Sequence, residues 1–254
     1  RPANSDTSTR LEPCPSLHFT STMIPIHTQS AWRGTSDCRS CAVREVALFS
    51  NLNEEDFALI HAPIDDMAYR AHQVLFNEGD AAGGIFTLRS GMLKLSRITG
   101  DGRRRILRLL RPGDVVGLEA LATGRYDSEA AALTDVTLCR IPTEVVHKLN
   151  LNSPRMHAGL LDKWHKALRE ADDWLASINF GTAQQRVCQF ILKMRHTTDP
   201  AFVTLFSRED MGAMMDLKQE TVSREISALV KAGALQPVDK LGRLYRIIDE
   251  SLLQ

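Results

Sequence analysis

Three polar side chains near the C-terminus have the types and the spacing needed to read DNA bases. Glu220, Ser223 and Arg224 lie at positions i, i+3 and i+4, so a helix would place all three on one face. A glutamate can accept a hydrogen bond from cytosine N4, and an arginine can donate two to guanine O6 and N7. Apolar residues at helical spacing, such as Ile226, fall on the opposite side. The segment 217–233 therefore predicts a helix suited to the major groove.

The residues around this helix predict a winged helix-turn-helix over 181–254. Ser207 is suited to cap the preceding helix, with Asp210 at its third position. Met215 and Asp216 are expected to form the turn between the two helices. Apolar stretches then flank the polar segment 239–243, which is typical of a β-hairpin wing.

Cationic and amide side chains near the predicted helix are candidates for contacts to DNA phosphates. Such contacts position a protein on the duplex without reading its sequence. Each candidate could equally be an ordinary solvated surface residue. The formal net charge is zero, which argues against broad nucleic-acid binding but permits a local basic face. The candidates are Arg208, Lys218, Gln219, Lys231, Lys240 and Arg243.

The middle of the chain has the periodicity of β-strands. Over 73–142 apolar and polar residues alternate, and turn signals recur about every ten residues. Many short, evenly spaced strands favour an antiparallel sandwich or barrel such as a jelly roll. A short helical pattern at 52–72, with Asn53 as a candidate N-cap, precedes it. We expect an α+β protein with a β-roll sensor domain over 37–150.

A long helix is expected over 151–180, with Pro154 in its first turn. Apolar residues recur along it every seven residues in two rows, as at the a and d positions of a coiled coil. Such a stripe could form a dimer seam, or it could pack on the strands of the same chain. The predicted seam comprises Leu161, Trp164, Leu168, Ala171, Leu175 and Ile178.

The chain has five cysteines, an odd number that favours free thiols, a metal site or a redox site in a reducing compartment. Cys38 and Cys41 form a C-x-x-C motif, and Cys139 lies on the last expected strand. Cys14 belongs to residues 1–36, a stretch rich in Ser, Thr and Pro that predicts a flexible arm. Cys188 lies in an apolar helical pattern, as a buried structural thiol does.

Several classes of function are not expected. No histidine occurs in 73–142, although metal-dependent cupins need clustered histidines on neighbouring strands. No nucleophile elbow, P-loop or Rossmann fingerprint is present, so we do not expect an enzyme. No apolar run of about 18 residues and no secretory signal pattern occur, which predicts a cytoplasmic protein without a membrane span.

From Cys38 onward the chain resembles the Crp/Fnr family of bacterial transcription regulators. The resemblance rests on ETVSR at 220–224, on GDVVGLEAL at 113–121 and on the order of the expected elements. It implies a homodimer on palindromic double-stranded DNA, acting as a transcription activator or repressor that contacts RNA polymerase. The set Glu220, Ser223 and Arg224 is similar to that of the oxygen-responsive Fnr branch, which implies half-sites of the TTGAT type.

The resemblance also implies a signal to which the regulator responds. Cys38, Cys41 and Cys139 align with three of the four cysteines that hold a [4Fe–4S] cluster in the Fnr branch, but Ala47 stands at the fourth position. Because a [4Fe–4S] cluster needs a ligand on each iron, a substitute is required. Cys14, Asp37 and His27 are candidates. The alternatives are a thiol redox pair, a zinc site, haem or nitric-oxide sensing, and a constitutive regulator.

A cyclic nucleotide is not the expected effector. Nucleotide-binding members of the family carry Glu directly after the Gly of the signature, whereas Leu118 follows Gly117 here. Acidic residues occupy 127–130, where an arginine should meet the phosphate, and they would repel it. Glu119 is displaced by one position, and we expect it to be a structural carboxylate that accepts hydrogen bonds from backbone donors.

Overall fold

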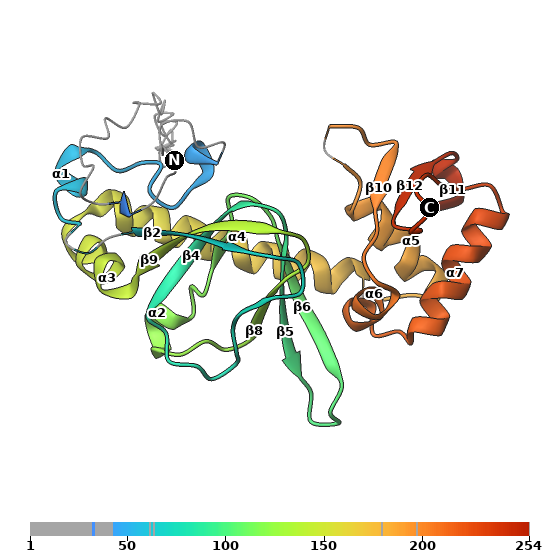
Figure 1. Ribbon diagram of the computed structural model, residues 1–254, viewed down its shortest axis with the longest axis horizontal. Coiled ribbons are helices and arrows are strands. Elements are labelled where there is room, and N and C mark those ends of the chain that lie inside the picture. The colour runs from blue at the N-terminus through green and yellow to red at the C-terminus, as the bar shows by residue number, and fades with distance from the viewer. Residues whose placement is uncertain are drawn as a thin grey trace, which may run out of the picture.

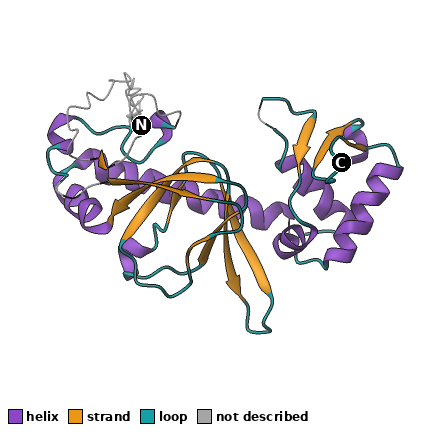
Figure 2. Cartoon of the chain, viewed as in Figure 1, coloured by secondary structure: helices purple, strands orange, loops and turns teal. Residues whose placement is uncertain are grey.

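A computed structural model of the chain describes residues 32–33, 43–60, 62, 64–178, 180–196 and 198–253. One long helix, α4 (Pro154–Ile178), runs through the molecule, with a β-rich domain along its first part and a smaller, mostly helical domain at its end (Figure 1). Colouring by secondary structure shows strands concentrated beside the middle of this helix (Figure 2). The predicted α+β architecture is confirmed. Among the described residues, no helix is long and apolar enough to span a membrane.

The β-rich domain consists of two sheets that enclose an apolar core. One sheet has the order β1-β2-β9-β4-β7 and the other β3-β8-β5-β6, with antiparallel neighbours except for β1 and β2. Buried side chains from both sheets form one cluster, which includes Phe86, Leu95 and Leu138. The strands are β1 (Trp32–Arg33), β2 (Ile64–Tyr69), β3 (Val74–Phe76), β4 (Gly84–Ser90), β5 (Leu93–Ile98), β6 (Arg104–Leu110), β7 (Val115–Val116), β8 (Glu129–Ala132) and β9 (Val136–Pro142).

The start of this domain differs from the expected pattern. The predicted helix is the single turn α1 (Glu54–Phe57), which has the predicted cap, because Asn53 and Asp56 form a reciprocal capping box. Strand β2 then begins at Ile64, nine residues before the predicted change of periodicity, because its backbone pairs with β9. The predicted arm 1–36 contains β1, which pairs with β2; the rest of that arm lies outside the described residues.

The predicted long helix is divided at Ser153. Helix α3 (Thr143–Asn152) ends there, and α4 begins at Pro154, as its sequence predicts. Ser153 has an extended backbone, and its Oγ accepts a hydrogen bond from the Met156 backbone N–H at 3.1 Å. One residue therefore ends the first helix and caps the second. Two further short helices are η2 (Arg44–Val46) and α2 (Ala120–Thr123).

The C-terminal domain is a helix-turn-helix with a three-stranded sheet of order β10-β12-β11. Ser207 caps α6 as predicted, and Asp216 ends it in the left-handed conformation with φ 53°. Cys188 is buried, as predicted, and burial raises the pKa of its thiol. The elements are α5 (Ala183–Lys193), β10 (Phe202–Thr204), α6 (Arg208–Met215), α7 (Gln219–Lys231), β11 (Leu235–Pro237), β12 (Leu244–Ile247) and η3 (Glu250–Leu253).

Candidate DNA-binding interface and sensor domain

Helix α7 has one buried and one exposed face. Val222 and Ile226 are buried in a cluster that also contains residues of α5 and α6. The side chains of Glu220, Ser223 and Arg224 are exposed on the other face. The burial pattern therefore follows the 3.6-residue period of the sequence and leaves the polar triplet available to a ligand.

The carboxyl group of Glu220 is held in its ionised form. Its own backbone N–H donates to it, and Gln219 Nε2 donates to Oε1 at 3.3 Å, so the pKa of Glu220 is lowered. A carboxylate is the form that accepts a hydrogen bond from the amino group of cytosine. Gln219 therefore contacts a member of the triplet at the start of α7.

A close approach between the two helices depends on Gly212 in α6. A Cβ atom at this position would lie 2.4 Å from the Leu217 carbonyl oxygen, so any larger residue would push the turn away. Gly212 is not among the predicted site residues, although a glycine inside a helical pattern often marks a close backbone contact. This glycine sets how tightly α7 is held against α6.

The wing is fixed to the helices by Arg208. Its Nη2 donates to the Tyr245 hydroxyl at 2.8 Å and to the Gly242 carbonyl at 3.4 Å, and the guanidinium lies over the Tyr245 ring. The structure therefore gives this residue, a candidate for phosphate contact, a role within the domain. The remaining candidates are exposed: Lys218, Gln219, Lys231, Lys240 and Arg243.

The apolar stripe of α4 is largely uncovered by the described part of the chain. Leu161, Trp164, Leu168 and Leu175 are between 42% and 62% exposed, and Ala171 is half-buried. Ile178 differs from the prediction, because it is buried in the core of the C-terminal domain and is not available to a partner. The exposed stripe therefore ends one helical turn earlier than the sequence indicated.

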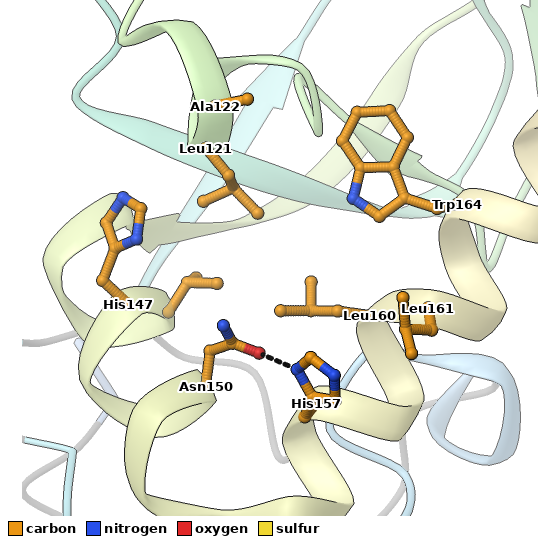
Figure 3. A pocket seen from close by; sticks show the side chains of 9 residues that line it. Leu121, Ala122, His147, Asn150, His157, Leu160, Leu161 and Trp164 are labelled. Atoms are coloured by element: carbon orange, nitrogen blue, oxygen red, sulfur yellow. Dashed lines mark hydrogen bonds between the residues drawn. The ribbon is translucent and has the colours of Figure 1, made fainter.

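An apolar groove continues this stripe between α2, α3 and α4. Leu161 and Trp164 border it, together with Leu121 of α2 and His147 of α3 (Figure 3). At its edge His157 Nδ1 and Asn150 Oδ1 are 3.0 Å apart and share a hydrogen bond. Apolar surface on the first half of α4 thus extends beyond the helix itself.

The signature at 113–121 forms part of the core of the β-rich domain. Leu118 is buried in an apolar cluster with residues of α3 and α4. Glu119 Oε1 is buried without a hydrogen-bond partner in the described part of the chain, so this oxygen lacks the predicted backbone donor. Glu119 is the N-cap residue of α2, but its side chain makes no hydrogen bond to the first turn of that helix.

The acidic residues at 127–130 are neutralised within the β-rich domain. Glu129 accepts hydrogen bonds from Arg104 and from Ser96 Oγ, the latter at 3.3 Å. Asp127 forms an ion pair with Arg97 at 3.9 Å. The predicted repulsion of a phosphate is therefore weaker than the sequence alone implied, because each carboxylate already has a cation beside it.

Of the candidate cluster ligands, only Cys139 belongs to the described residues. Cys14, Cys38 and Cys41 lie outside them, and within the described ranges no three His, Cys, Asp or Glu side chains are grouped as metal ligands. Cys139 is half-buried on β9, with its Sγ 3.9 Å from Asp66 Oδ1 on β2. Strand β1 pairs with the other edge of β2, which brings Arg33, five residues before Cys38, to the same sheet.

Comparison with known proteins identifies both domains. Residues 66–152 match the family described as Cyclic nucleotide-binding domain, and residues 185–254 match the family described as Crp-like helix-turn-helix domain. The chain belongs to the Crp/Fnr family. Together with the exposed polar face of α7, this makes the protein a DNA-binding transcription regulator of the Crp/Fnr type and not an enzyme.

Individual relatives agree with this assignment. The chain is 26% identical to the transcriptional activator protein FnrA of Stutzerimonas stutzeri, over 84% of this chain and 88% of that protein. It is also 26% identical to the anaerobic regulatory protein of Haemophilus influenzae, over 78% and 80% of the two chains. Among solved structures, FixK2 from Bradyrhizobium japonicum superposes with a TM-score of 0.66 at 26% identity, covering 75% of this chain and 95% of that one.

Proposed function

We propose that this Crp/Fnr-type regulator binds, as a homodimer, a palindrome with half-sites of the TTGAT type. Glu220, Ser223 and Arg224 would contact the bases. The observation that carries the proposal is the arrangement of α7, whose polar triplet is exposed while its apolar face is buried against α5 and α6. A helix of this form can enter the major groove and present three side chains to base edges.

The exposed stripe of α4 supports the dimer. Four large apolar side chains within about two heptads are unusual on a free helix surface, and a second α4 packed against them would bury them. A two-fold axis along this seam would present two copies of α7 to half-sites one turn of DNA apart. Lys218, Gln219, Lys240 and Arg243 are exposed around α7 and are proposed to contact phosphates.

The direct test is a fluorescence anisotropy titration with three duplexes of equal length at a fixed salt concentration near 150 mM. We expect tight binding to the palindrome, weaker binding to a duplex with one half-site, and the weakest binding to a scrambled duplex. Specific sites are commonly bound about 10³-fold or more tightly than non-specific DNA. Equal affinity for the palindrome and the scrambled duplex would contradict sequence-specific recognition by α7.

For the signal, we propose control by oxygen or redox state. One support is that a relative is named an anaerobic regulatory protein. A second is the sheet, where β1, whose last residue is five positions before Cys38 in the sequence, lies two strands away from β9, the strand that holds Cys139. These three residues, with Cys14 as the fourth, would hold a [4Fe–4S] cluster. When bound, such a cluster would supply sensitivity to oxygen, because oxygen destroys it. A regulator that uses thiols, haem or no effector is the alternative, and a cyclic nucleotide is not expected.

Anaerobic purification distinguishes a cluster-binding regulator from these alternatives. We expect anaerobically purified protein to be brown, to contain iron and sulfide, and to lose both colour and DNA affinity in air. Cys38→Ser should prevent iron incorporation, whereas Cys188→Ser should not, because Cys188 is buried in α5 of the other domain. A colourless anaerobic protein that binds DNA equally well in air would exclude the cluster and leave the DNA-binding proposal intact.

A further inference from the structure

The sensor domain contacts the helix-turn-helix through the hairpin of β5 and β6. In Figure 1 this hairpin lies next to α6, and Ile106 and Leu109 of β6 belong to the same buried cluster as Met211 and Met215 of α6. The packing connects the two domains of one chain at a place separate from the covalent link through α4. Movement of the sensor domain can therefore reach α6 directly.

Ion pairs accompany this packing at both ends of α6. In its first turn, Asp210 accepts hydrogen bonds from Lys94 of β5 and from the Ser207 hydroxyl, and both charged side chains are largely buried. At its C-terminal end, Asp216 forms ion pairs with Arg103, at 3.4 Å, and with Arg105. The hairpin thus supplies the cations and the helix-turn-helix supplies the anions.

Asp216 occupies a sensitive position for DNA binding. It lies in the turn, two residues before the N-cap Lys218 and four before Glu220. The N-terminus of a helix attracts anions such as phosphate, through its free N–H groups and its dipole. A bare carboxylate beside it would repel the DNA backbone, and Arg103 and Arg105 remove that repulsion by pairing with it.

We propose that Arg105 and Arg103 are positioning residues of the sensor domain that set the DNA affinity of α7 by neutralising Asp216. When the β5–β6 hairpin is docked, the group of Arg103, Arg105, Asp101 and Asp216 carries no net charge. When the hairpin separates from α6, Asp216 is left as an unpaired anion next to the N-terminus of α7. The inference rests on DNA binding through α7, and it adds an electrostatic route from the sensor domain to that helix.

Arg105→Gln in the full-length protein tests the proposal, with Arg97→Gln as the matched control. Arg97 lies on the same hairpin, but its partners Glu78 and Asp127 belong to the sensor domain. Without Arg105, the group of Arg103, Asp101 and Asp216 carries one net negative charge in each protomer. The dimer then presents two such charges to the DNA backbone, so Arg105→Gln should weaken binding about fivefold. The loss should be equal on palindromic and scrambled duplexes, because phosphates carry no sequence information. Arg97→Gln should stay within twofold of the unchanged protein.

The decisive variant is the double substitution Arg105→Gln with Asp216→Asn. Asparagine tolerates the left-handed backbone of this turn, so the fold should be kept. If charge is the cause, the double variant should bind within twofold of the unchanged protein. A double variant as weak as Arg105→Gln alone, or no loss from Arg105→Gln, would overturn the proposal. Failure of the proposed function would show differently, as absence of palindrome preference in the unchanged protein.

Hydrogen exchange supplies a second measurement. Asp216→Asn alone removes the ion pairs, so it should raise amide exchange in α6 and β6 while DNA is bound at least as tightly as before. A purely structural role for the contact predicts the opposite, namely that looser packing and weaker DNA binding always occur together. Loss of affinity in Asp216→Asn would therefore also overturn the proposal.

Discussion

Replacing Arg224 with alanine is expected to remove most of the preference for the palindrome over a scrambled duplex. One bidentate arginine–guanine contact supplies about 1–3 kcal/mol of discrimination, and a dimer uses it twice. The lower end of that range already corresponds to a loss of selectivity of about thirtyfold. The effect on stability should be small, because the Arg224 side chain is exposed and packs in no core.

The measurement is the ratio of the dissociation constants for the two duplexes, taken at one salt concentration. Arg243→Ala serves as the matched control, since it removes the same charge from an exposed wing position. It should weaken binding to both duplexes equally and lower the salt dependence, as the loss of a phosphate contact does. If Arg224→Ala kept the selectivity ratio of the unchanged protein, the assignment of α7 as the base-reading helix would be wrong.

Leu168→Glu is expected to convert the dimer into monomers. Leu168 is the most exposed residue of the stripe and lies near the middle of α4. Burying a leucine is worth about 1.5–3 kcal/mol, and placing two carboxylates in the same seam adds desolvation and repulsion. We therefore expect the dimer dissociation constant to rise by about 100-fold or more, with a parallel loss of palindrome binding.

Sedimentation velocity over a range of concentrations measures this change. Leu151→Glu is the matched control, because Leu151 is 83% exposed at the end of α3 and lies outside the stripe. That variant should remain a dimer and bind the palindrome normally. A dimer of undiminished stability in Leu168→Glu would mean that another surface joins the two protomers.

Local chemistry explains why much of the C-terminal domain could be predicted. Ser207 and Gly233 mark helix ends whose caps depend only on neighbouring residues, and both helices follow a clear apolar period. The same apolar period predicted which face of α7 is exposed. Asn53 and Pro154 are further cases, since each acts within one turn of its own position.

The features that could not be predicted from the sequence depend on contacts between distant parts of the chain. The β2 strand pairs with β9 about seventy residues later, and nothing in its own sequence shows that partner. Ile178 continues the heptad pattern of α4, but the C-terminal domain folds back and buries it. The hydrogen bond from Arg208 to the Tyr245 hydroxyl joins residues 37 positions apart, and neither residue's own sequence shows it. Periodicity and spacing identify elements, whereas these roles arise from tertiary packing.

The continuity of α4 has a mechanical consequence. Twenty-five residues in one unbroken helix span about 37 Å, and a stiff rod of that length acts as a lever. A tilt of about 5° at the Met156 end would displace the Ile178 end by about 3 Å, close to the 3.4 Å step between neighbouring base pairs. A very small rearrangement beside the first turns could thus move a recognition helix by one base pair along the groove.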